Sequence, residues 1–284
     1  MVELTLYHGD CLEVMKQIDD RSVDLIVCDL PYGCLAGGAG KEKEKRKNKV
    51  LDLRYDTGKT KPLNTYGGTL GSCQWDVKIN LEEFWKEIRR IRKNDHTPTI
   101  HFCTTKFGND LINSNPDEFR YDLVWNKERG VSFLTANKMP MRSHEMMYVF
   151  SKKGAYYQRI DEDAPGKKKG KGNIKTPRSA NVYMSANSKL HCSTGADENK
   201  ACALSVINLK KVGTSKQAHP TEKPSDLYRW LIDRYCPAGG TVLDPTFGSG
   251  NSVFTAFQMG RNAIGIEKDD QFFANAEQRL NELP

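Results

Sequence analysis

The turn Asp29-Leu30-Pro31-Tyr32 carries residue types that could hold a flat amine. It follows the apolar run at residues 23–28, which is typical of a buried parallel strand, so its side chains should stand at the carboxyl edge of a sheet. The Asp29 carboxylate and a backbone carbonyl can each accept one N–H bond of an exocyclic amino group, while Tyr32 stacks on the ring. Holding both hydrogens directs the nitrogen lone pair toward an electrophile. A structural proline turn is the alternative interpretation.

A second candidate site lies at residues 241–267, where a strand ends at Asp244 and a turn with Gly248 and Gly250 leads directly into a helix. Glycines allow a ligand to approach the backbone closely, and the helix start offers free N–H groups. Glu267 closes the next strand, where nucleoside-binding sheets place the carboxylate that accepts hydrogen bonds from ribose. The alternative is a tight turn with glycine for packing. A dinucleotide fingerprint would need a third glycine at the helix, and this loop lacks it.

Other site classes receive little support. Gly58-Lys59-Thr60 resembles the end of a phosphate loop, but Leu53 stands where its first glycine belongs. His191 and Cys192 have no partners at metal-ligand spacing, so we predict no metal site. The cysteines form no C-x-x-C pair and indicate free thiols in a reducing cytosol; they are Cys11, Cys28, Cys34, Cys73, Cys103, Cys192, Cys202 and Cys236.

Length and charge narrow the class of protein. The chain has 284 residues, enough for one substantial core with a smaller appended module. No apolar stretch reads as a membrane span or a secretory signal, so we expect a cytoplasmic protein. The net charge of +7 favours polyanionic partners without proving a nucleic-acid binder.

The elements that position the two sites follow an alternating pattern. Strands are expected at residues 23–28, 99–103, 121–125, 146–150, 241–243 and 263–266, and helices at 81–93, 225–235, 252–259 and 271–281. This alternation predicts an α/β fold with a doubly wound, mostly parallel sheet. Residues 33–73 form a charged insertion, and residues 153–215 read as a loop-rich module outside the main sheet.

Together these segments resemble the β class of amino-methylating DNA methyltransferases. Asp29-Leu30-Pro31-Tyr32 stands for D-P-P-Y, and residues 244–250 stand for D-P-F-x-G-S-G. Residues 219–224 look like H-P-T-x-K-P, residues 137–145 like A-x-K-x-P-x-R-x-H-E, and Gly9-Asp10-Cys11 like the N-terminal G-D motif. Trp75-Asp76 falls where members carry W-D. The resemblance covers residues 1–34, 73–152 and 216–284, with Leu30 replacing a proline and the insertion at 33–73 as departures.

The resemblance implies a Rossmann-like enzyme that transfers methyl from S-adenosylmethionine to N6 of a flipped adenine in double-stranded DNA, because N4-cytosine members more often carry Ser at the position of Asp29. It implies a catalytic part (1–152), a target-recognition region (153–215) and a cofactor-binding part (216–284). The implied catalytic residues are Asp29, Leu30, Pro31 and Tyr32. The implied cofactor-binding residues are Asp10, Cys11, Asp29, His219, Thr221, Lys223, Asp244, Phe247, Gly248, Ser249, Gly250, Asn251, Glu267 and Lys268.

Several alternatives stay open at this point. They are an N4-cytosine enzyme, a methylase that acts on RNA or a small molecule, and an inactive DNA-binding protein of the same fold. A C5-cytosine enzyme is disfavoured because the chain has no Pro-Cys pair, and Cys28 lies in an apolar strand. The sequence is compatible with a bacterial or phage-encoded enzyme, a homodimer, and the presence or absence of a restriction enzyme.

Some surface features allow two interpretations each. The basic runs at 41–49 and 167–175 could neutralise phosphates or be solvated loops. Tyr156, Tyr157 and Tyr183 could stack on bases, although packing within the recognition module is favoured. Phe133 could lie near the flipped base or belong to the core.

Overall fold

The computed structural model describes residues 2–31, 78–131, 133, 136–163, 200–212 and 222–282. By its internal contacts the chain divides into a large unit, Met1–Tyr157 with Val206–Pro284, and a small unit, Gln158–Ser205. In the described part of the small unit, β6 (Glu162–Asp163) pairs with β7 (Lys200–Ala201) in an antiparallel ladder. All other elements belong to the large unit.

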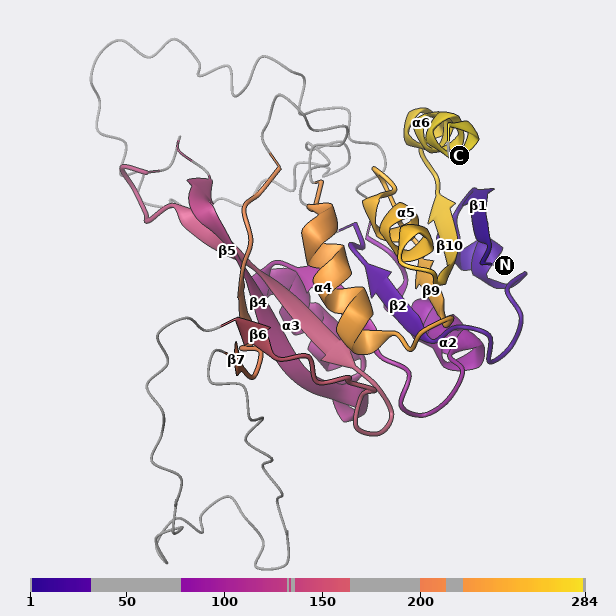
Figure 1. Cartoon of the computed structure of the whole chain (residues 1–284), viewed down its shortest axis with the longest axis horizontal. Coiled ribbons are helices and arrows are strands. Elements are labelled where there is room, and N and C mark those ends of the chain that lie inside the picture. Colours follow the sequence, from indigo (N-terminus) through magenta and orange to yellow (C-terminus); the bar gives the residue numbers. More distant parts are fainter. Residues whose placement is uncertain are drawn as a thin grey trace, which may run out of the picture. The chain divides into compact units, whose positions relative to one another are not determined.

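The large unit contains one eight-stranded sheet (Figure 1). From one edge to the other its strands are β1 (Leu4–His8), β10 (Asn262–Glu267), β9 (Thr241–Asp244), β2 (Leu25–Cys28), β3 (Thr99–Cys103), β5 (Arg142–Phe150), β4 (Phe119–Val131) and β8 (Val206–Asn208). Within this sheet β5 runs antiparallel to both of its neighbours, and every other pairing is parallel. The predicted mostly parallel sheet is therefore confirmed.

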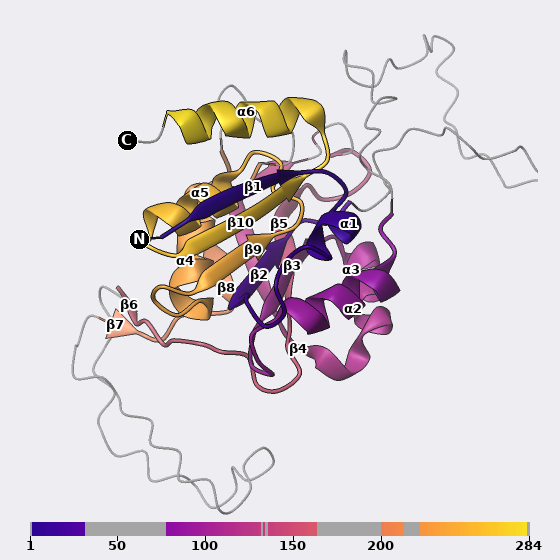
Figure 2. The same ribbon diagram turned by 90° about the vertical axis from the view of Figure 1, so that its right-hand side faces the viewer.

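Helices cover both faces of the sheet (Figure 2). One face carries α1 (Cys11–Met15), α2 (Leu81–Ile91) and α3 (Thr105–Ser114), with the short 3-10 helix η1 (Pro116–Glu118) after it; the other carries α4 (Ser225–Tyr235), α5 (Asn251–Gln258) and α6 (Asp270–Asn281). Alternate residues of β2 serve the two cores, because Leu25 and Val27 pack with α4 and α5 whereas Ile26 and Cys28 pack with α2. This is the doubly wound arrangement that the alternation predicts.

Local sequence signals explain where α2 begins and which face it buries. The Asn80 side chain accepts hydrogen bonds from the backbone N–H groups of Glu82 and Glu83, which caps α2. Apolar residues at helical spacing then bury one face of α2; they are Phe84, Trp85, Ile88 and Ile91. The predicted helix and its cap are confirmed.

The order of the strands creates a topological switch point between β9 and β2. From β2 the chain crosses through α2 to β3, whereas from β9 it crosses through α5 to β10 on the other side. In open α/β sheets, ligands bind where neighbouring strands send their connections in opposite directions. The turns that follow β2 and β9 are the two candidate sites of the sequence.

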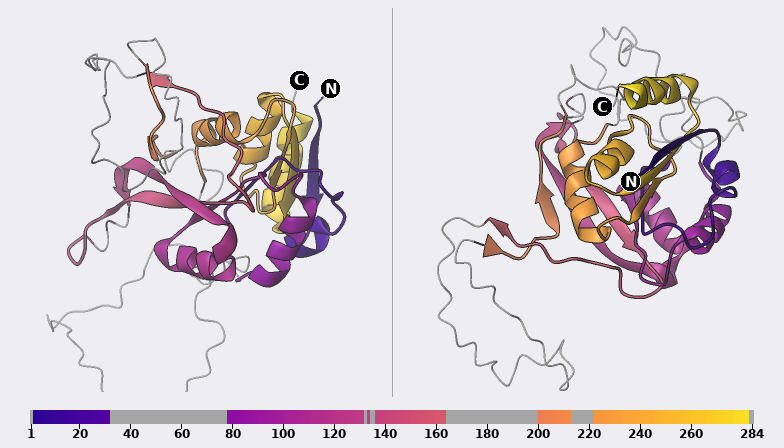
Figure 3. Two further views of the ribbon diagram at one scale, coloured as in Figure 1. Left: turned by 90° about the horizontal axis from the view of Figure 1, so that it is seen from below. Right: turned by 45° about the vertical axis from the view of Figure 1, so that its right-hand side comes forward.

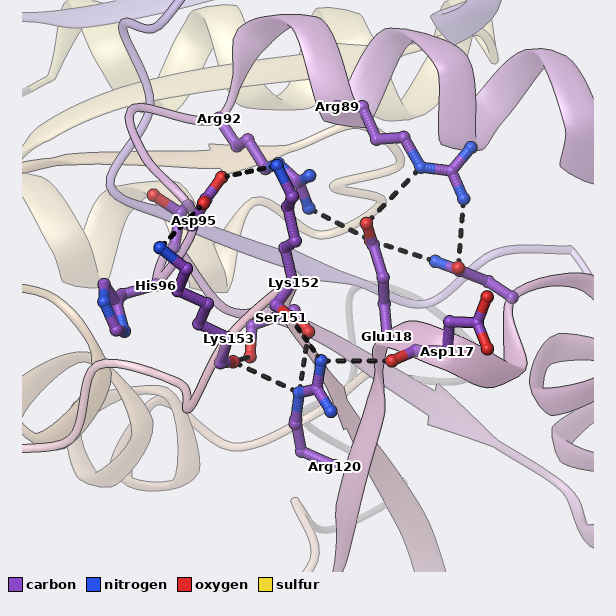
Figure 4. Close-up of polar contacts among 12 residues, drawn as sticks. Arg89, Arg92, Asp95, His96, Asp117, Glu118, Arg120, Ser151, Lys152 and Lys153 are labelled. Atoms are coloured by element: carbon purple, nitrogen blue, oxygen red, sulfur yellow. Dashed lines mark hydrogen bonds and ion pairs between the residues drawn. The ribbon is translucent and has the colours of Figure 1, made fainter.

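The opposite, amino edge of the sheet is tied together by ion pairs, some exposed and some nearly buried (Figure 4). Glu118 pairs with Arg92 at 3.0 Å and with Arg89 at 3.5 Å, which links η1 to α2. Asp95 pairs with Lys152 at 3.2 Å and with Lys153 at 3.3 Å. The Arg120 guanidinium donates to the backbone carbonyls of residues 151–153. These contacts join elements that the sheet alone would leave separate.

Three segments differ from the expectations. Residues 206–208 were expected outside the main sheet, but β8 pairs with β4, because Ile207 is buried and the Trp125 indole N–H donates to the Leu209 carbonyl at 2.8 Å. The Tyr157 ring contacts the ring of Tyr235 in α4 in a tilted arrangement, with centroids 5.5 Å apart, so it packs on the large unit and not within a recognition module. Phe133 is 78% exposed, so the core interpretation is wrong.

The elements β1, α1 and α3 were not predicted, because β1 and α1 are short and α3 contains glycine and asparagine. Several predictions fall on residues outside the described ranges. They concern the insertion at 33–73 with its basic run at 41–49, the run at 167–175, Tyr32, Trp75, Asp76, Tyr183, His191, Cys192, His219 and Thr221. None of the helices in the described ranges has the length and apolar character that a membrane crossing requires.

Candidate active site at the carboxyl edge of the sheet

The glycine loop after β9 has a fixed shape. Gly248 and Gly250 both adopt positive φ angles, of 52° and 78°, which glycine tolerates far better than other residues. At Gly250 a Cβ atom would also stand 2.8 Å from the Phe254 ring. The Asp244 carboxylate accepts hydrogen bonds from the Ser252 hydroxyl at 2.5 Å and the Thr246 N–H at 3.0 Å, so the two ends of the loop are joined.

Glu267 connects this loop to the end of β10. Its carboxylate accepts hydrogen bonds at 2.8 Å from the backbone N–H groups of Gly248, Lys268 and Asp269. Burial raises the pKa of Glu267 above its usual value. A carboxylate offers about four acceptor positions, so one remains for a hydroxyl of a ligand. The structure thus gives Glu267 a role in shaping the loop, in addition to the role expected from the sequence.

Asp10 lies beside Glu267, because β1 pairs with β10 and places His8 opposite Glu267. One Asp10 oxygen accepts the Leu12 N–H at 3.0 Å and caps α1, and the other pairs with the Lys268 ammonium at 3.0 Å. Cys11 is buried, which raises its pKa to about 12, so it is an uncharged thiol. The ends of β1 and β10 therefore bring together four of the predicted residues: Asp10, Cys11, Glu267 and Lys268.

Asp29 follows β2 and forms an ion pair with Lys223, whose side chain is only 4% exposed. The Lys223 ammonium also lies 3.6 Å from one oxygen of Glu145 on β5 and 4.8 Å from the centre of the Phe102 ring. The second Glu145 oxygen pairs with Lys127 of β4 at 2.9 Å. Residues after β2, before α4 (Ser225–Tyr235), on β5 and on β4 thus form one chain of charges, Asp29–Lys223–Glu145–Lys127.

The neighbouring turns hold a concentration of negative charge. Burial raises the pKa of Asp244 to about 7, and the carboxylates of Asp29 and Glu267 add to this shift. Burial also raises the pKa of Tyr228 well above its usual value, again with help from Asp244 and Asp29. Leu30 is buried and Pro31 half-buried directly after Asp29. The two candidate sites are therefore electrostatically coupled, as residues at one sheet edge should be.

Asn251, the first residue of α5, connects the glycine loop to Lys223. Its side-chain amide donates to the Lys223 carbonyl at 3.0 Å and to the Glu222 carboxylate at 2.8 Å, and it accepts from Arg279 at 3.0 Å. Arg279 also donates to the carbonyl of Ser249 at 3.3 Å. Phe247 is buried in the same loop, where its N–H donates to the Ile266 carbonyl. The predicted loop residues lie together around the start of α5.

Glu145, Lys127 and Arg279 belong to this edge and were not among the predicted site residues. Glu145 lies in the stretch 137–145 that resembles a family motif, and this was the available signal. Its pairing with Lys223 depends on a contact across 78 positions of sequence, which no local pattern reveals. Tyr32, His219 and Thr221 lie outside the described residues, so their places in the site stay predictions.

Two other chemistries find no support in the described parts of the chain. Cys28 is fully buried, its Sγ lies 3.1 Å from His101 Nδ1, and burial raises its pKa well above the usual value, so it is unsuited to act as a thiolate nucleophile. Among the described residues, no group of three His, Cys, Asp or Glu side chains is arranged to hold a metal ion.

Comparison with protein-family models finds a match over most of the chain. A family model described as DNA methylase, of the N6/N4 methylases, matches residues 23–278. The chain belongs to this family. The match includes Asp29, Glu145, Lys223, the glycine loop and Glu267, so every part of the site described above except β1, Asp10, α1 and Arg279 falls within it. The resemblance stated from the motifs is confirmed.

Individual relatives of this DNA methylase agree. The Type II methyltransferase M.HinfI of Haemophilus influenzae is 28% identical over 296 residues, which cover 98% of this chain and 68% of the relative. Among solved structures, the M1.HpyAVI–SAM complex has a TM-score of 0.56 and 18% identity, covering 98% of this chain and 99% of the other. The cytosine-N4-specific PvuII DNA methyltransferase has a TM-score of 0.59 and 15% identity, covering 99% and 88%. Both structures show a shared fold.

Proposed function

We propose that this DNA methylase transfers a methyl group from S-adenosylmethionine to N6 of an adenine flipped out of double-stranded DNA. One observation carries the proposal: Asp29 and the glycine loop, 215 positions apart, end adjoining parallel strands at the switch point of the sheet. A donor held by the loop and an amine held by Asp29 would therefore meet.

The cofactor is S-adenosylmethionine, and the chemistry of this edge fits it. Asp10 and Glu267, at the ends of β1 and β10, are suited to the adenosine hydroxyls and ring. The carboxylates of Asp29 and Asp244 and the ammonium of Lys223 are suited to the zwitterionic methionine end. Three inter-strand spacings separate β1 from β2, about 14 Å in all, which matches an extended nucleoside joined to an amino acid. When bound, the cofactor supplies an electrophilic methyl group on sulfur.

The residues of the chain would act by holding the amine. Asp29 accepts one amino N–H, and the backbone carbonyl of Leu30 accepts the other, with Pro31 stiffening the turn. When the nitrogen gains the methyl group it would lose one proton, and the Asp29 carboxylate is placed to accept that proton. Lys223 pairs with the Asp29 carboxylate and would fix its orientation, so it is a positioning residue. Positioning of this kind supplies most of the rate enhancement in direct transfers.

N4 of cytosine is the alternative target. It stays open because the PvuII DNA methyltransferase, which shares the fold, is cytosine-N4-specific. Both bases present an exocyclic amino group beside a ring nitrogen, so the same two acceptors serve either. The aspartate at position 29 favours adenine, because N4-cytosine members of the resembled class more often carry serine there. The target-recognition role proposed for residues 153–215 does not decide between the bases.

The test is to incubate the protein with unmethylated duplex DNA and isotopically labelled S-adenosylmethionine, digest the DNA to nucleosides, and identify the labelled one by mass spectrometry. We expect N6-methyldeoxyadenosine. N4-methyldeoxycytidine would support the alternative target. DNA and cofactor binding without transfer would indicate an inactive protein of this fold, and label in RNA or a small amine alone would contradict a DNA substrate.

A further inference from the structure

The outer half of β4 and β5 forms a two-stranded ribbon that leaves the sheet (Figures 1 and 3). β8 pairs with β4 only from Val124 to Asn126, and β3 pairs with β5 only from Met146 onward. Beyond these positions β4 and β5 have only each other as partners within the sheet. We call residues 127–131, 133 and 136–144 the ribbon arm.

The arm has a distorted backbone near its base. Between the paired positions Asn126–His144 and Val131–Arg142, β4 carries residues 127–130 whereas β5 carries Ser143 alone. Glu128 has a φ of 56°, which is rare for a residue other than glycine. A Cβ atom at Gly130 would stand 2.4 Å from the end of the Met141 side chain. Bulges of this kind re-aim a strand, and they are common beside active sites.

Three cations in the outer part of the arm lack ion-pair partners among the described residues. Arg129, Lys138 and Arg142 are exposed, and none of them forms an ion pair with a residue in the described ranges. At the amino edge, by contrast, Arg89, Arg92, Lys152 and Lys153 are all paired with carboxylates (Figure 4). Exposed, unpaired cations that share one small element are available for an external polyanion.

Large apolar side chains accompany these cations. Phe133 is 78% exposed, Met139 58% and Met141 38%, which makes the arm the site of three of the exposed large apolar residues in the described chain. Isolated exposed apolar residues are normal, but a group of them on one projecting element marks a contact surface. Apolar side chains next to cations suit nucleic acid, where they contact sugars and base steps while the cations neutralise phosphates.

The arm is also continuous with the active edge. At its base Lys127 pairs with Glu145, and Glu145 contacts Lys223, which pairs with Asp29. Lys211, just after β8, lies near Lys127 and Lys223. Burial lowers its pKa, and the charges of these two lysines lower it further. Any duplex that delivers a base to Asp29 therefore passes close to the base of the arm.

We propose that the ribbon arm is a DNA-binding element that contacts the duplex beside the target base. The cations Arg129, Lys138 and Arg142 bind phosphates, and the apolar side chains of Phe133 and Met139 contact sugars or bases. This rests on the proposed function and adds a contact surface that is separate from residues 153–215. The chemical class of partner is duplex DNA, because the arm begins at Lys127, which Glu145 and Lys223 link to Asp29, the residue proposed to hold the target amine.

The charges are tested with the full-length triple variant Arg129→Gln, Lys138→Gln, Arg142→Gln. The matched control, Lys16→Gln, Lys152→Gln, Lys153→Gln, removes the same charge from exposed pairs elsewhere. Duplex affinity is measured by fluorescence anisotropy over a range of KCl concentrations. Each lost phosphate contact should reduce the slope of log K against log [salt] by about 0.9, so the arm variant should lose about 2 to 3 units of slope. The control should keep the wild-type slope.

The apolar contacts are tested with Phe133→Ser combined with Met139→Ser. Because burial of apolar surface does not depend on counterions, this variant should weaken duplex binding by about threefold to tenfold at every salt concentration, with the slope unchanged. Cofactor affinity and melting temperature should match wild type in all variants. Wild-type affinity and slope in the charge variant would overturn the proposal. That result differs from failure of the proposed function, in which the wild-type protein itself transfers no methyl group to DNA.

Discussion

The amino and carboxyl edges of the central sheet, where the parallel strands begin and end, differ in how their charged side chains are arranged. At the amino edge, Asp95 meets two exposed lysines, and Glu118 meets Arg89 and Arg92, so each contact joins elements of the fold (Figure 4). At the carboxyl edge, Lys223 is buried between Asp29 and Glu145, and Asp244 has a pKa raised to about 7 by burial. The exposed pairs of Asp95 contribute little and tolerate change. The Glu118–Arg92 pair is nearly buried, but it is a matched pair that joins two elements. At the carboxyl edge several buried charges meet at strand ends, an arrangement that is costly to maintain and marks a site.

The largest difference in stability and transfer rate should appear when one lysine is replaced at each edge. Lys223→Met leaves Asp29 and Glu145 with less compensation in a buried setting, which should lower the free energy of unfolding by about 3–5 kcal/mol. For a chain of this size that corresponds to a melting temperature about 10 °C lower. Transfer should also fall by about 100-fold, because Asp29 loses its orientation. Calorimetric melting and single-turnover transfer measure both effects, and an unchanged melting temperature would contradict a buried charge cluster.

A matched pair of glycines, one at each edge and both with positive φ, sharpens the comparison. Gly250 in the active loop and Gly239 before β9 have φ angles of 78° and 70°, but only Gly250 has a ring in the way of a Cβ atom. Gly239→Ala should lower the free energy of unfolding by about 1–2 kcal/mol from backbone strain. Gly250→Ala should lower it by about 1–3 kcal/mol more through overpacking. Cofactor affinity by calorimetry should fall at least tenfold for Gly250→Ala and stay unchanged for Gly239→Ala.

Asp244 should make the carboxyl edge sensitive to pH near neutrality. Its folded pKa of about 7 lies above the ordinary value of 3.8, so the folded protein binds the extra proton between these pH values. Stability of the cofactor-free protein should therefore fall as pH rises from about 4 to 7 and then level off. A cationic ligand beside Asp244 favours the ionised form, so cofactor affinity should increase from pH 6 to pH 8. Both trends should weaken in Asp244→Asn, and identical trends in that variant would assign them to another group.

The smallest effect is expected at the amino edge itself. Lys152→Gln removes one exposed partner of Asp95, which keeps its pair with Lys153. The free energy of unfolding should change by less than about 1 kcal/mol, and transfer should not change. Urea denaturation and the transfer assay check this, and a loss of transfer would mean that the two edges are coupled.

The sequence predicted the parts of the fold that carry strong periodicity or punctuation. The bounds of α4 and of β3 were predicted without error, and the switch point followed from the order of strands and helices. β8 was missed because three residues of strand within a polar stretch gain their stability from Trp125 and not from local pattern. The motifs indicated Asp29, Gly250 and Glu267, but not that Lys223 bridges Asp29 to Glu145, because this depends on tertiary contacts.

The most direct test of the active edge is the transfer rate of Asp29→Ala, measured in the same preparation as its affinity for S-adenosylmethionine. Loss of the amine acceptor should reduce single-turnover transfer to DNA by at least about 10²- to 10³-fold, with cofactor affinity nearly unchanged. Asp29→Asn, which keeps one carbonyl acceptor, should recover part of the rate, and Asp117→Ala at the exposed amino edge should behave as wild type. Transfer by a folded Asp29→Ala protein at the wild-type rate would contradict the assignment of methyl transfer to the edge between β9 and β2.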